Sequence, residues 1–468
     1  MNADQMVILI PIEIKVRELL SKLLMAYKLI NHIDCRIFLG SQRYIFSRFK
    51  KIQNVIWLDK NTLYSKFKSK PLSNNADHFV KIMLDEEGPL VWNYGASNKL
   101  RFPPQILNFY DKIVLHGKSD FNILKKRKKK NKFIILGHPR YDLLLRYKKI
   151  FIKEKNNIRQ IYKKYIFIVS SFGFDGYVSQ DIENAIIKRN SFNNDVQKNL
   201  KINLIDKQKV YQNYLSLVEL TKTIAEEMKD YTVIFRPHPT QDLIKVKKRF
   251  SKVPKNLKII YEKTVTPWIM GCDFFIHSGC STYVEAHLFK KKIINFYAYK
   301  YTNYFEFNYA GNTFFNIQKC LSFIKNNISK KNFLYNKKPI ENILHNLIKN
   351  KDFCKEFAFY LKSNYGSLKP IIEKWPYKKT NFLKEKVFHI LSFIKNNFIL
   401  KSFVSRYLPG YLFFSKEYKD KKFNHLKKNE IVNFFNEISL IDKNNFSEKI
   451  IISKFAKDVY EIKRSNLF

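Results

Sequence analysis

The segment RPHP, residues 236–239, carries side chains well suited to binding an anion. It follows an apolar stretch, residues 231–235, that has the pattern of a buried strand. Ligands of open α/β sheets bind beyond the carboxyl ends of the strands, so Arg236 and His238 are expected to face a ligand. Arginine offers a planar fork of donors to phosphate oxygens, and imidazole can donate a hydrogen bond or transfer a proton. The alternative is a turn shaped by the two prolines, with an incidental histidine.

The segment HSGCSTYVEA, residues 277–286, follows another expected strand, residues 273–276. Gly279 permits an unusual turn, and Ser278 or Ser281 can cap a helix that starts near Thr282. A helix amino terminus is a ready phosphate site, and an acidic residue one turn later can accept hydrogen bonds from ribose hydroxyls. A simple capped helix is the alternative. The residues of this segment predicted to bind a phosphate-bearing ligand are His277, Ser278, Gly279, Ser281, Thr282 and Glu285.

Clustered carboxylates follow a strand expected at residues 79–84, in the segment LDEEG, residues 84–88. Clustered carboxylates raise one another's pKa, which suits a general base. A second acidic candidate, Glu13, follows the first expected strand in the segment PIEIKVRE, residues 11–18. A solvated acidic turn and a solvated helix start are the structural alternatives. The candidate bases are Glu13, Asp85, Glu86 and Glu87.

Three basic residues of the first half of the chain are possible substrate contacts. Lys15 and Arg17 lie in PIEIKVRE, close to Glu18. Arg140 lies in GHPRYD, residues 137–142, after a further expected strand. For GHPRYD the structural interpretation is favoured, with Asp142 as a helix cap.

Several motifs are absent from the sequence. No Asp-X-Asp stands anywhere in it, so a common pair of metal-holding carboxylates is missing. There is no Walker A loop, no GxGxxG after an expected strand and no GxSxG turn. We therefore expect neither a metal nor a cofactor.

The elements that must position these residues alternate as in a βαβ series. Short apolar runs alternate with amphipathic stretches, which predicts parallel sheets covered on both faces. The segment from Phe172 to Lys207, rich in Asn, Asp and Lys, is expected to be a loop, and Leu215 to Lys229 a helix. Strands are expected at residues 6–11, 35–39, 55–58, 79–84, 112–115, 133–136, 165–169, 231–235, 257–260, 273–276 and 292–296.

The composition predicts a globular protein of two domains with an appendage. The chain has 468 residues, 45% of them hydrophobic, and a formal net charge of +46. Such a charge attracts nucleic acid, anionic lipid or a phosphate-bearing substrate, although lysine scattered among Asn, Ile, Phe and Tyr is also typical of an AT-rich genome. Five dispersed cysteines argue against disulfides and zinc sites. With no evident signal peptide and no long apolar run, a cytoplasmic location is expected.

After about Lys355 the sequence becomes rich in lysine and aromatic residues and shows no clear strands. We expect its first part to form helices that pack back on the domains. The segment from Phe388 to Phe414 reads either as core or as a basic, aromatic helix lying on an anionic membrane surface.

As a set, the five motifs resemble those of bacterial surface-carbohydrate biosynthesis proteins of the GT-B glycosyltransferase fold. More distantly, the first two motifs resemble capsular Kdo transferases and CDP-glycerol glycerophosphotransferases. The resemblance covers residues 6–300 and departs from the expected pattern at SSFGF after Val169 and at Lys290 to Lys292, where a glycine often stands. It implies an α/β fold of two facing Rossmann-like domains, an acceptor domain at residues 1–150 and a donor domain at residues 151–354, followed by a helical extension at residues 355–468.

The expected reaction is an inverting, metal-independent transfer from a nucleotide-sugar donor to a glycan or lipid-linked glycan acceptor of a surface polysaccharide or lipopolysaccharide. A first-domain carboxylate would take the acceptor's proton, and Arg236, His238 and the helix at Thr282 would stabilise the departing phosphate. Other enzymes remain open: a nucleotide-sugar 2-epimerase-like protein or a CDP-glycerol-type glycerophosphotransferase. A basic nucleic-acid-binding protein and a non-catalytic scaffold are the alternatives from other classes.

Overall fold

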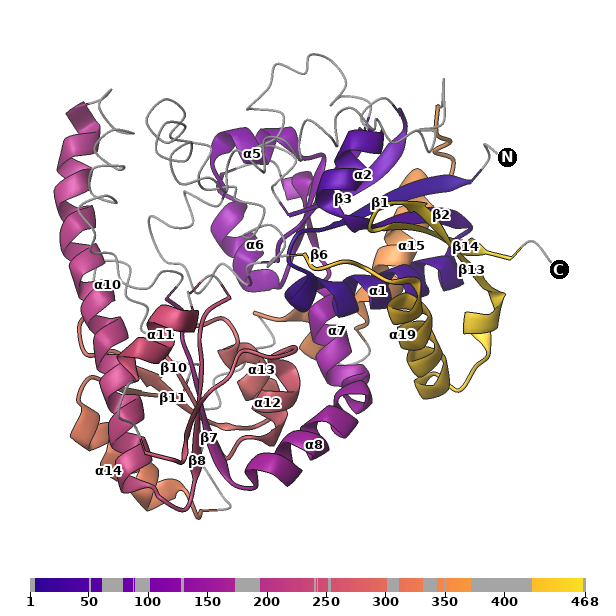
Figure 1. The fold of residues 1–468 in the computed structure, drawn as a ribbon. Coiled ribbons are helices and arrows are strands. Elements are labelled where there is room, and N and C mark those ends of the chain that lie inside the picture. Colours follow the sequence, from indigo (N-terminus) through magenta and orange to yellow (C-terminus); the bar gives the residue numbers. More distant parts are fainter. Residues whose placement is uncertain are drawn as a thin grey trace, which may run out of the picture.

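The computed structural model describes residues 5–49, 52–60, 79–86, 88, 102–127, 130–172, 194–239, 241, 243–250, 254–300, 311–330, 343–348, 351–371 and 423–465. The described strands form two separate sheets, one in each lobe of the molecule (Figure 1). We call residues 5–147, 343–371 and 423–465 the first lobe, and residues 152–330 the second lobe.

The sheet of the first lobe has the strand order β13-β14-β2-β1-β3-β4-β5-β6. Its first six strands along the chain run parallel, and every residue of β1, with the sequence MVILIPI, is buried because both faces of the sheet are covered. The parallel strands are β1 (Met6–Ile12), β2 (Cys35–Ser41), β3 (Val55–Asp59), β4 (Phe79–Leu84), β5 (Lys112–Leu115) and β6 (Phe133–Ile135).

Helix α1 (Lys15–His32) is the central helix of the first lobe. Its apolar residues recur at helical spacing, and Leu23, Leu24, Tyr27 and Ile30 are fully buried. It packs against α7 (Pro139–Arg146), α15 (Phe353–Tyr365) and α19 (Lys428–Ile441). The other helical elements of this lobe are α2 (Gln42–Phe49), α5 (Pro104–Phe109), α6 (Lys118–Leu124), η3 (Lys130–Lys132), η5 (His345–Leu347) and η7 (Phe446–Lys449), and η4 (Lys148–Phe151) leads into the second lobe.

The sheet of the second lobe is parallel, with the order β12-β11-β10-β7-β8-β9. In its register Val169 of β7 lies opposite both Arg236 of β8 and His277 of β10. The RPHP and HSGCSTYVEA segments therefore begin on either side of the end of β7, at the carboxyl end of the sheet. The strands are β7 (Tyr165–Val169), β8 (Thr232–Arg236), β9 (Leu257–Ile259), β10 (Phe274–His277), β11 (Lys292–Phe296) and β12 (Asn312–Phe314). The strand predictions are confirmed to within two residues, although β12 was not predicted.

One helix of the second lobe differs from the prediction. Helix α10 (Asn194–Glu227) stands along the outer flank of the lobe in Figure 1 and begins inside the expected loop from Phe172 to Lys207. The loop prediction is wrong from Asn194 onward, and residues 173–193 lie outside the described part of the chain. The other helices are α8 (Ile152–Tyr162), α11 (Leu243–Arg249), α12 (Thr266–Gly271), α13 (Tyr283–Leu288) and α14 (Ile317–Asn327).

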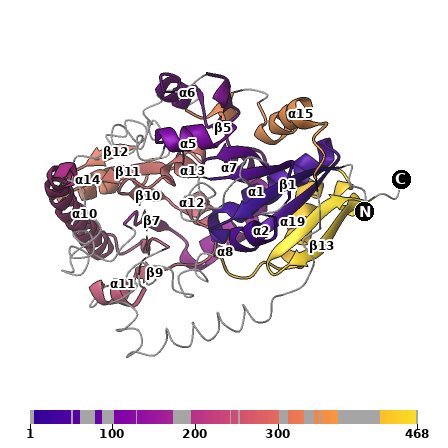
Figure 2. The ribbon, with the colours of Figure 1, turned by 90° about the horizontal axis from the view of Figure 1, so that it is seen from above.

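The end of the chain returns to the first lobe. The expectation of no strands after Lys355 is wrong, because β13 (Ile450–Ala456) and β14 (Val459–Arg464) form a hairpin whose second strand pairs antiparallel with β2. Figure 2 shows this hairpin and α19 along the edge of the first lobe. As predicted, α15 packs back on the fold. The segment from Phe388 to Phe414 lies outside the described residues. Within the described chain, no helix combines the length and apolar character needed to cross a bilayer.

Candidate functional site

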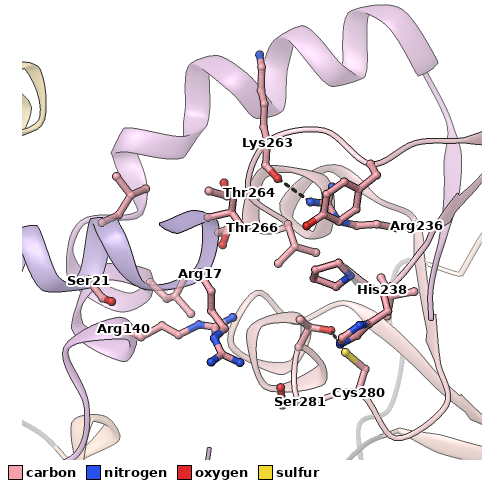
Figure 3. A pocket seen from close by; sticks show the side chains of 18 of the residues that line it. Arg17, Ser21, Arg140, Arg236, His238, Lys263, Thr264, Thr266, Cys280 and Ser281 are labelled. Carbon is pink, nitrogen blue, oxygen red and sulfur yellow. Dashed lines mark hydrogen bonds between the residues drawn. The ribbon is translucent and has the colours of Figure 1, made fainter. Parts of the chain in front are cut away.

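An open pocket of about 180 Å³ lies between the two lobes, at the carboxyl ends of β7 and β8 (Figure 3). The first lobe contributes Arg17 from α1 and Arg140 from α7, and the second lobe contributes Arg236, His238 and Ser281. Among the described residues that line the pocket there is no aspartate or glutamate. A concave surface with cations and no carboxylates attracts anions.

Arg236 is buried at the end of β8 and is held by backbone carbonyl groups. Its Nη1 donates to the oxygen of Glu262 at 2.8 Å and its Nη2 to the oxygen of Lys263 at 2.6 Å. The guanidinium carbon lies 5.0 Å from the centre of the Tyr261 ring. Burial lowers the pKa of Arg236 to about 10. Arg236 thus supplies positive charge to the pocket wall and also fixes the loop that forms its rim.

His238 stands in a turn that is closed by Gln241. The Gln241 side chain accepts from the backbone N–H of His238 at 2.8 Å, and its own backbone N–H donates to the His238 carbonyl at 2.9 Å. The imidazole is half-buried and points toward the turn at Cys280 and Ser281 in Figure 3. His238 is the histidine among the described residues that line the pocket.

Three residues predicted to bind the donor instead build the turn after β10. His277 is fully buried, and its Nδ1 accepts from the backbone N–H of Cys280 at 3.2 Å. Ser278 is buried and donates to the carbonyl of Phe296 at 2.7 Å. Gly279 has φ of 73°, and a Cβ there would lie 2.1 Å from the Tyr297 hydroxyl, so only glycine fits. The structure brings none of the three to the pocket lining, where Ser281 and Thr282 do lie.

The helix that follows this turn begins where it was predicted. Thr282 is the N-cap residue of α13, and its side chain makes no capping hydrogen bond. The prediction that Ser278 or Ser281 caps this helix is therefore wrong. Helix α13 spans only Tyr283–Leu288. The charge of the pocket thus comes mainly from its arginines rather than from a long helix dipole.

Glu285 and Arg140, predicted as separate ligand contacts, form an ion pair with each other across the two lobes. Glu285 is 1% exposed, and its other oxygen accepts from the Thr266 hydroxyl at 2.6 Å. Burial alone would lower the pKa of Arg140, but the nearby Glu285 carboxylate has the larger effect, so the pKa is raised above its usual value. Both oxygens of Glu285 are therefore engaged within the protein.

The charged residues of PIEIKVRE divide between structure and pocket. Glu13 pairs with Lys60 at 2.7 Å, and Lys15 pairs with Glu430 of α19, also at 2.7 Å. Glu18 is fully buried and accepts from the backbone N–H of Glu13 at 2.9 Å. Of this group only Arg17 lines the pocket.

The two described carboxylates of LDEEG do not line the pocket. Asp85 and Glu86 are buried, neither is among the residues that line the pocket, and Glu87 lies outside the described residues. The Glu86 carboxylate is 3.4 Å from Lys22 and 3.4 Å from His138. Burial favours a raised pKa, but the charge of Lys22 and the contact with His138 outweigh it and hold the pKa of Glu86 well below its usual range. The prediction of a raised pKa is therefore wrong for Glu86, and its carboxylate is a poor proton acceptor.

Two partners in this network, His138 and Lys22, were not predicted from the sequence. His138 is the N-cap of α7, where its Nδ1 accepts from the Arg140 N–H at 3.1 Å, so the prediction of Asp142 as the cap is wrong. Lys22 bridges Glu18 at 2.9 Å and Glu86 at 3.4 Å. The spacing of four residues between Glu18 and Lys22 on one helix was a usable signal for the first of these contacts.

Among the described residues, Asp142, Asp352 and Cys354 bring possible metal-ligand atoms within 4.8 Å of one another. The Asp142 carboxylate accepts from the Asn346 side chain at 2.7 Å and from the Cys354 backbone N–H at 3.2 Å. None of the three clustered residues lines the pocket. Protein hydrogen bonds account for the position of Asp142.

Two Rossmann-like α/β lobes facing each other across a pocket at the carboxyl ends of their strands define the GT-B fold. Solved structures of similar fold include the wall teichoic acid polymerase TagF, at 12% identity and TM-score 0.46, covering 78% of this chain and 90% of that one. A Methanocaldococcus jannaschii UDP-GlcNAc 2-epimerase in complex with UDP-GlcNAc and UDP is 13% identical over 77% of this chain and 99% of that one, with TM-score 0.45. S. aureus MnaA with UDP is 14% identical over 79% and 98%, with TM-score 0.42. No protein-family model matches the chain and no curated protein is significantly similar to it.

Proposed function

We propose that this protein is a glycosyltransferase that moves a sugar from a nucleotide-activated donor to a surface-glycan acceptor, with inversion and without a metal. One observation carries the proposal. The pocket between the lobes presents Arg17, Arg236 and His238, with no carboxylate among the described lining residues. Such a surface suits the diphosphate of a nucleotide-sugar.

In this proposal the phosphates of the donor bind beside Arg17 and Arg236. Glu285 pairs with Arg140, Arg17 lies 3.6 Å from the buried Glu18, and Arg236 donates to backbone carbonyl groups. Arg17 and Arg236 thus bring positive charge to the pocket lining from both lobes. They come from opposite lobes, and a diphosphate between them would draw the lobes together. Their guanidinium groups take the place that a divalent cation has in metal-dependent transferases.

The transfer step is a single displacement at the anomeric carbon. The acceptor hydroxyl oxygen forms the new bond on one face while the bond to the phosphate oxygen breaks on the other, which inverts the configuration. The nucleoside diphosphate leaves with the electron pair, and Arg17 and Arg236 stabilise its charge. We assign the hydroxyl proton to His238, because Glu13 is paired with Lys60 and the other described candidate bases lie off the pocket.

Nucleotide binding tests the donor site. Thermal-shift measurements with CMP, CDP, UDP and GDP should show one diphosphate raising the melting temperature, since a ligand of the folded state stabilises it. Arg17→Met should weaken that nucleotide about tenfold or more, the effect of losing a charge-assisted hydrogen bond. The control is Arg159→Met, which removes an ion pair with Asp273 inside the second lobe. This variant should bind the nucleotide as the wild type does. If none of the four nucleotides binds, the proposed donor site is wrong. Tight binding of nucleic acid instead would favour a nucleic-acid-binding protein.

Turnover tests the reaction class. With the matching nucleotide-sugar and a membrane glycan extract, the wild type should release nucleoside diphosphate, and His238→Ala should lower kcat about 10²–10³-fold. Activity of His238→Ala within a few-fold of the wild type would contradict the assignment of the proton. Conversion of the donor alone to its epimer would identify an epimerase, and release of CMP from CDP-glycerol a glycerophosphotransferase. Nucleotide binding without turnover on any acceptor would favour a scaffold.

A further inference from the structure

The ion pair between Arg140 and Glu285 connects the two lobes beside the pocket. Arg140 belongs to α7 of the first lobe and Glu285 to α13 of the second. The Glu285 side chain is 1% exposed and that of Arg140 is 18% exposed. A pair this buried exists only while the lobes are together, since an open crevice would return both charges to water.

Arg140 is held firmly on the first lobe. Its backbone N–H donates to Nδ1 of His138, and the Asn346 side chain contacts both backbone groups of His138, at 3.0 Å and 3.1 Å. Gly137 packs so closely on Asn346 that an added Cβ would lie 2.0 Å from its side-chain oxygen. The start of α7 is therefore a rigid base for the Arg140 side chain.

Glu285 is held just as firmly on the second lobe. Its second oxygen accepts from the hydroxyl of Thr266, which is 6% exposed and begins α12. The flanking residues Val284 and Ala286 are buried in the core. The Glu285 carboxylate thus bridges α12 of its own lobe to α7 of the other.

The pair lies at the wall of the anion pocket. Arg140 and Thr266 both line the pocket, and in Figure 3 the guanidinium of Arg17 lies next to that of Arg140. We propose that Glu285 is a positioning residue, which holds Arg140 against the pocket and keeps the lobes closed, rather than a ligand of the donor's ribose. This inference deepens the proposed donor site and rests on it.

The charges lead to an asymmetric expectation. Without Arg140, the Glu285 carboxylate stays buried beside the phosphate site with no partner from the other lobe, and it repels the incoming diphosphate. Without both charges, that repulsion disappears. The double variant should therefore bind nucleotide better than the variant that lacks Arg140 alone.

Titration calorimetry with the nucleotide diphosphate that the wild type binds separates the two roles. Arg140→Met should weaken binding about 100-fold, Glu285→Gln only a few-fold, and Arg140→Met with Glu285→Gln should recover at least tenfold over Arg140→Met. A ribose ligand gives the opposite pattern, in which Glu285→Gln alone costs tenfold or more and the double variant is no better than Arg140→Met. That pattern would overturn the inference.

Small-angle X-ray scattering without nucleotide supplies a readout that does not depend on the proposed function. Arg140→Met and Glu285→Gln should each increase the radius of gyration, and the exchanged pair, Arg140→Glu with Glu285→Arg, should bring it back toward the wild-type value. Arg159→Met, which breaks a pair inside the second lobe, is the matched control and should cause no change. Unchanged scattering of both single variants overturns the closing role. If the wild type binds no nucleotide while the single variants still show these scattering changes, the proposed donor site is refuted and the closing role of the ion pair is supported.

Discussion

The two lobes place charged residues at the same position, just beyond the carboxyl ends of parallel strands, but use them differently. In the first lobe Glu18, Lys22 and Glu86 are buried, and Lys22 pairs with both carboxylates. In the second lobe Arg236 and His238 line a pocket, with no carboxylate among its described lining residues. Sequence position alone therefore does not separate a structural charge from a functional one.

The difference lies in whether a charge finds its partner when the protein folds. The first-lobe network contains acids and bases in contact, so it is neutralised internally, and the pKa values of both Glu18 and Glu86 are lowered although burial alone would raise them. The pocket cations have fewer carboxylate partners: Arg140 pairs with Glu285, Arg17 lies 3.6 Å from Glu18, and Arg236 donates to backbone carbonyl groups. Charge left over at a concave surface is what a ligand can neutralise.

The largest expected effect comes from breaking the first-lobe network. Lys22→Met leaves the Glu18 and Glu86 carboxylates, 0% and 1% exposed, without their shared ammonium group. Removing one partner of a buried ion pair typically costs about 3–5 kcal/mol. Urea unfolding followed by circular dichroism should show a loss of this size in the free energy of unfolding.

The second lobe supplies the contrasting variant. His238→Ala, half-buried at the pocket, should change the free energy of unfolding by less than about 1 kcal/mol while it reduces turnover. Two outcomes would contradict the proposed difference between the first-lobe network and the pocket residues. One is an equal loss of stability in both variants, and the other is an unchanged free energy of unfolding in Lys22→Met.

A smaller effect should come from Asp142, a buried first-lobe carboxyl whose nearest ionic partner, Arg146, is partly exposed. Burial, followed by the nearby charge of Asp352, raises the pKa of Asp142 from 3.8 to about 7. The folded state then binds the proton more tightly than the unfolded state. The stability that Asp142 contributes is full below pH 3.8 and is lost as the pH rises through about 7.

Asp142→Asn removes that titration. Between pH 5.5 and pH 8, the free energy of unfolding of the wild type should fall by about 2 kcal/mol relative to the variant. Urea unfolding of both proteins at several pH values measures the difference. Parallel pH profiles would show that Asp142 titrates normally and that its hydrogen bonds from Asn346 and Cys354 compensate fully for burial.

The parallel strands and the meeting of RPHP with HSGCSTYVEA were predictable, because both follow from apolar runs and from the geometry of parallel sheets. The partners of charged residues were not, since they depend on contacts between distant segments. Arg140 and Glu285 are 145 residues apart, and Lys15 and Glu430 are 415 apart. Pattern alone assigned ligand roles to Lys15, Arg140 and Glu285, but in the structure Lys15 pairs with Glu430, and Arg140 pairs with Glu285.

Two elements were missed for local reasons. The hairpin of β13, with the sequence IIISKFA, and β14, with the sequence VYEIKR, shows little alternation of apolar and polar residues, and its lysines make it resemble the helical segments before it. In the first part of α10 the weak helix formers Asn and Asp conceal an apolar repeat at Val196, Leu200 and Leu204. In both cases the prediction followed the polar composition of the segment, which was typical of another kind of structure.

The smallest expected effect concerns the turn after α13 in the second lobe. Here the chain has lysines, whereas the family that it resembles often has a glycine. Lys290 follows α13 with φ of 53°, a left-handed conformation that side chains disfavour. Its N–H donates to the carbonyl of His287 and the N–H of Lys291 to that of Ala286, each at 2.9 Å, which is the hydrogen-bond pattern of a helix end that usually carries glycine.

Lys290→Gly should therefore stabilise the protein, by about 0.5–1 kcal/mol, since relief of the backbone strain exceeds the added entropy of the unfolded chain. Lys258→Gly is the control: Lys258 is an exposed residue of β9, where glycine should destabilise by a similar amount. Lys290 does not line the pocket, so Lys290→Gly should leave nucleotide affinity unchanged. A loss of stability in Lys290→Gly would mean that the lysine side chain contributes more than its backbone conformation costs. A change in nucleotide affinity would mean instead that the end of α13 is coupled to the pocket through Glu285.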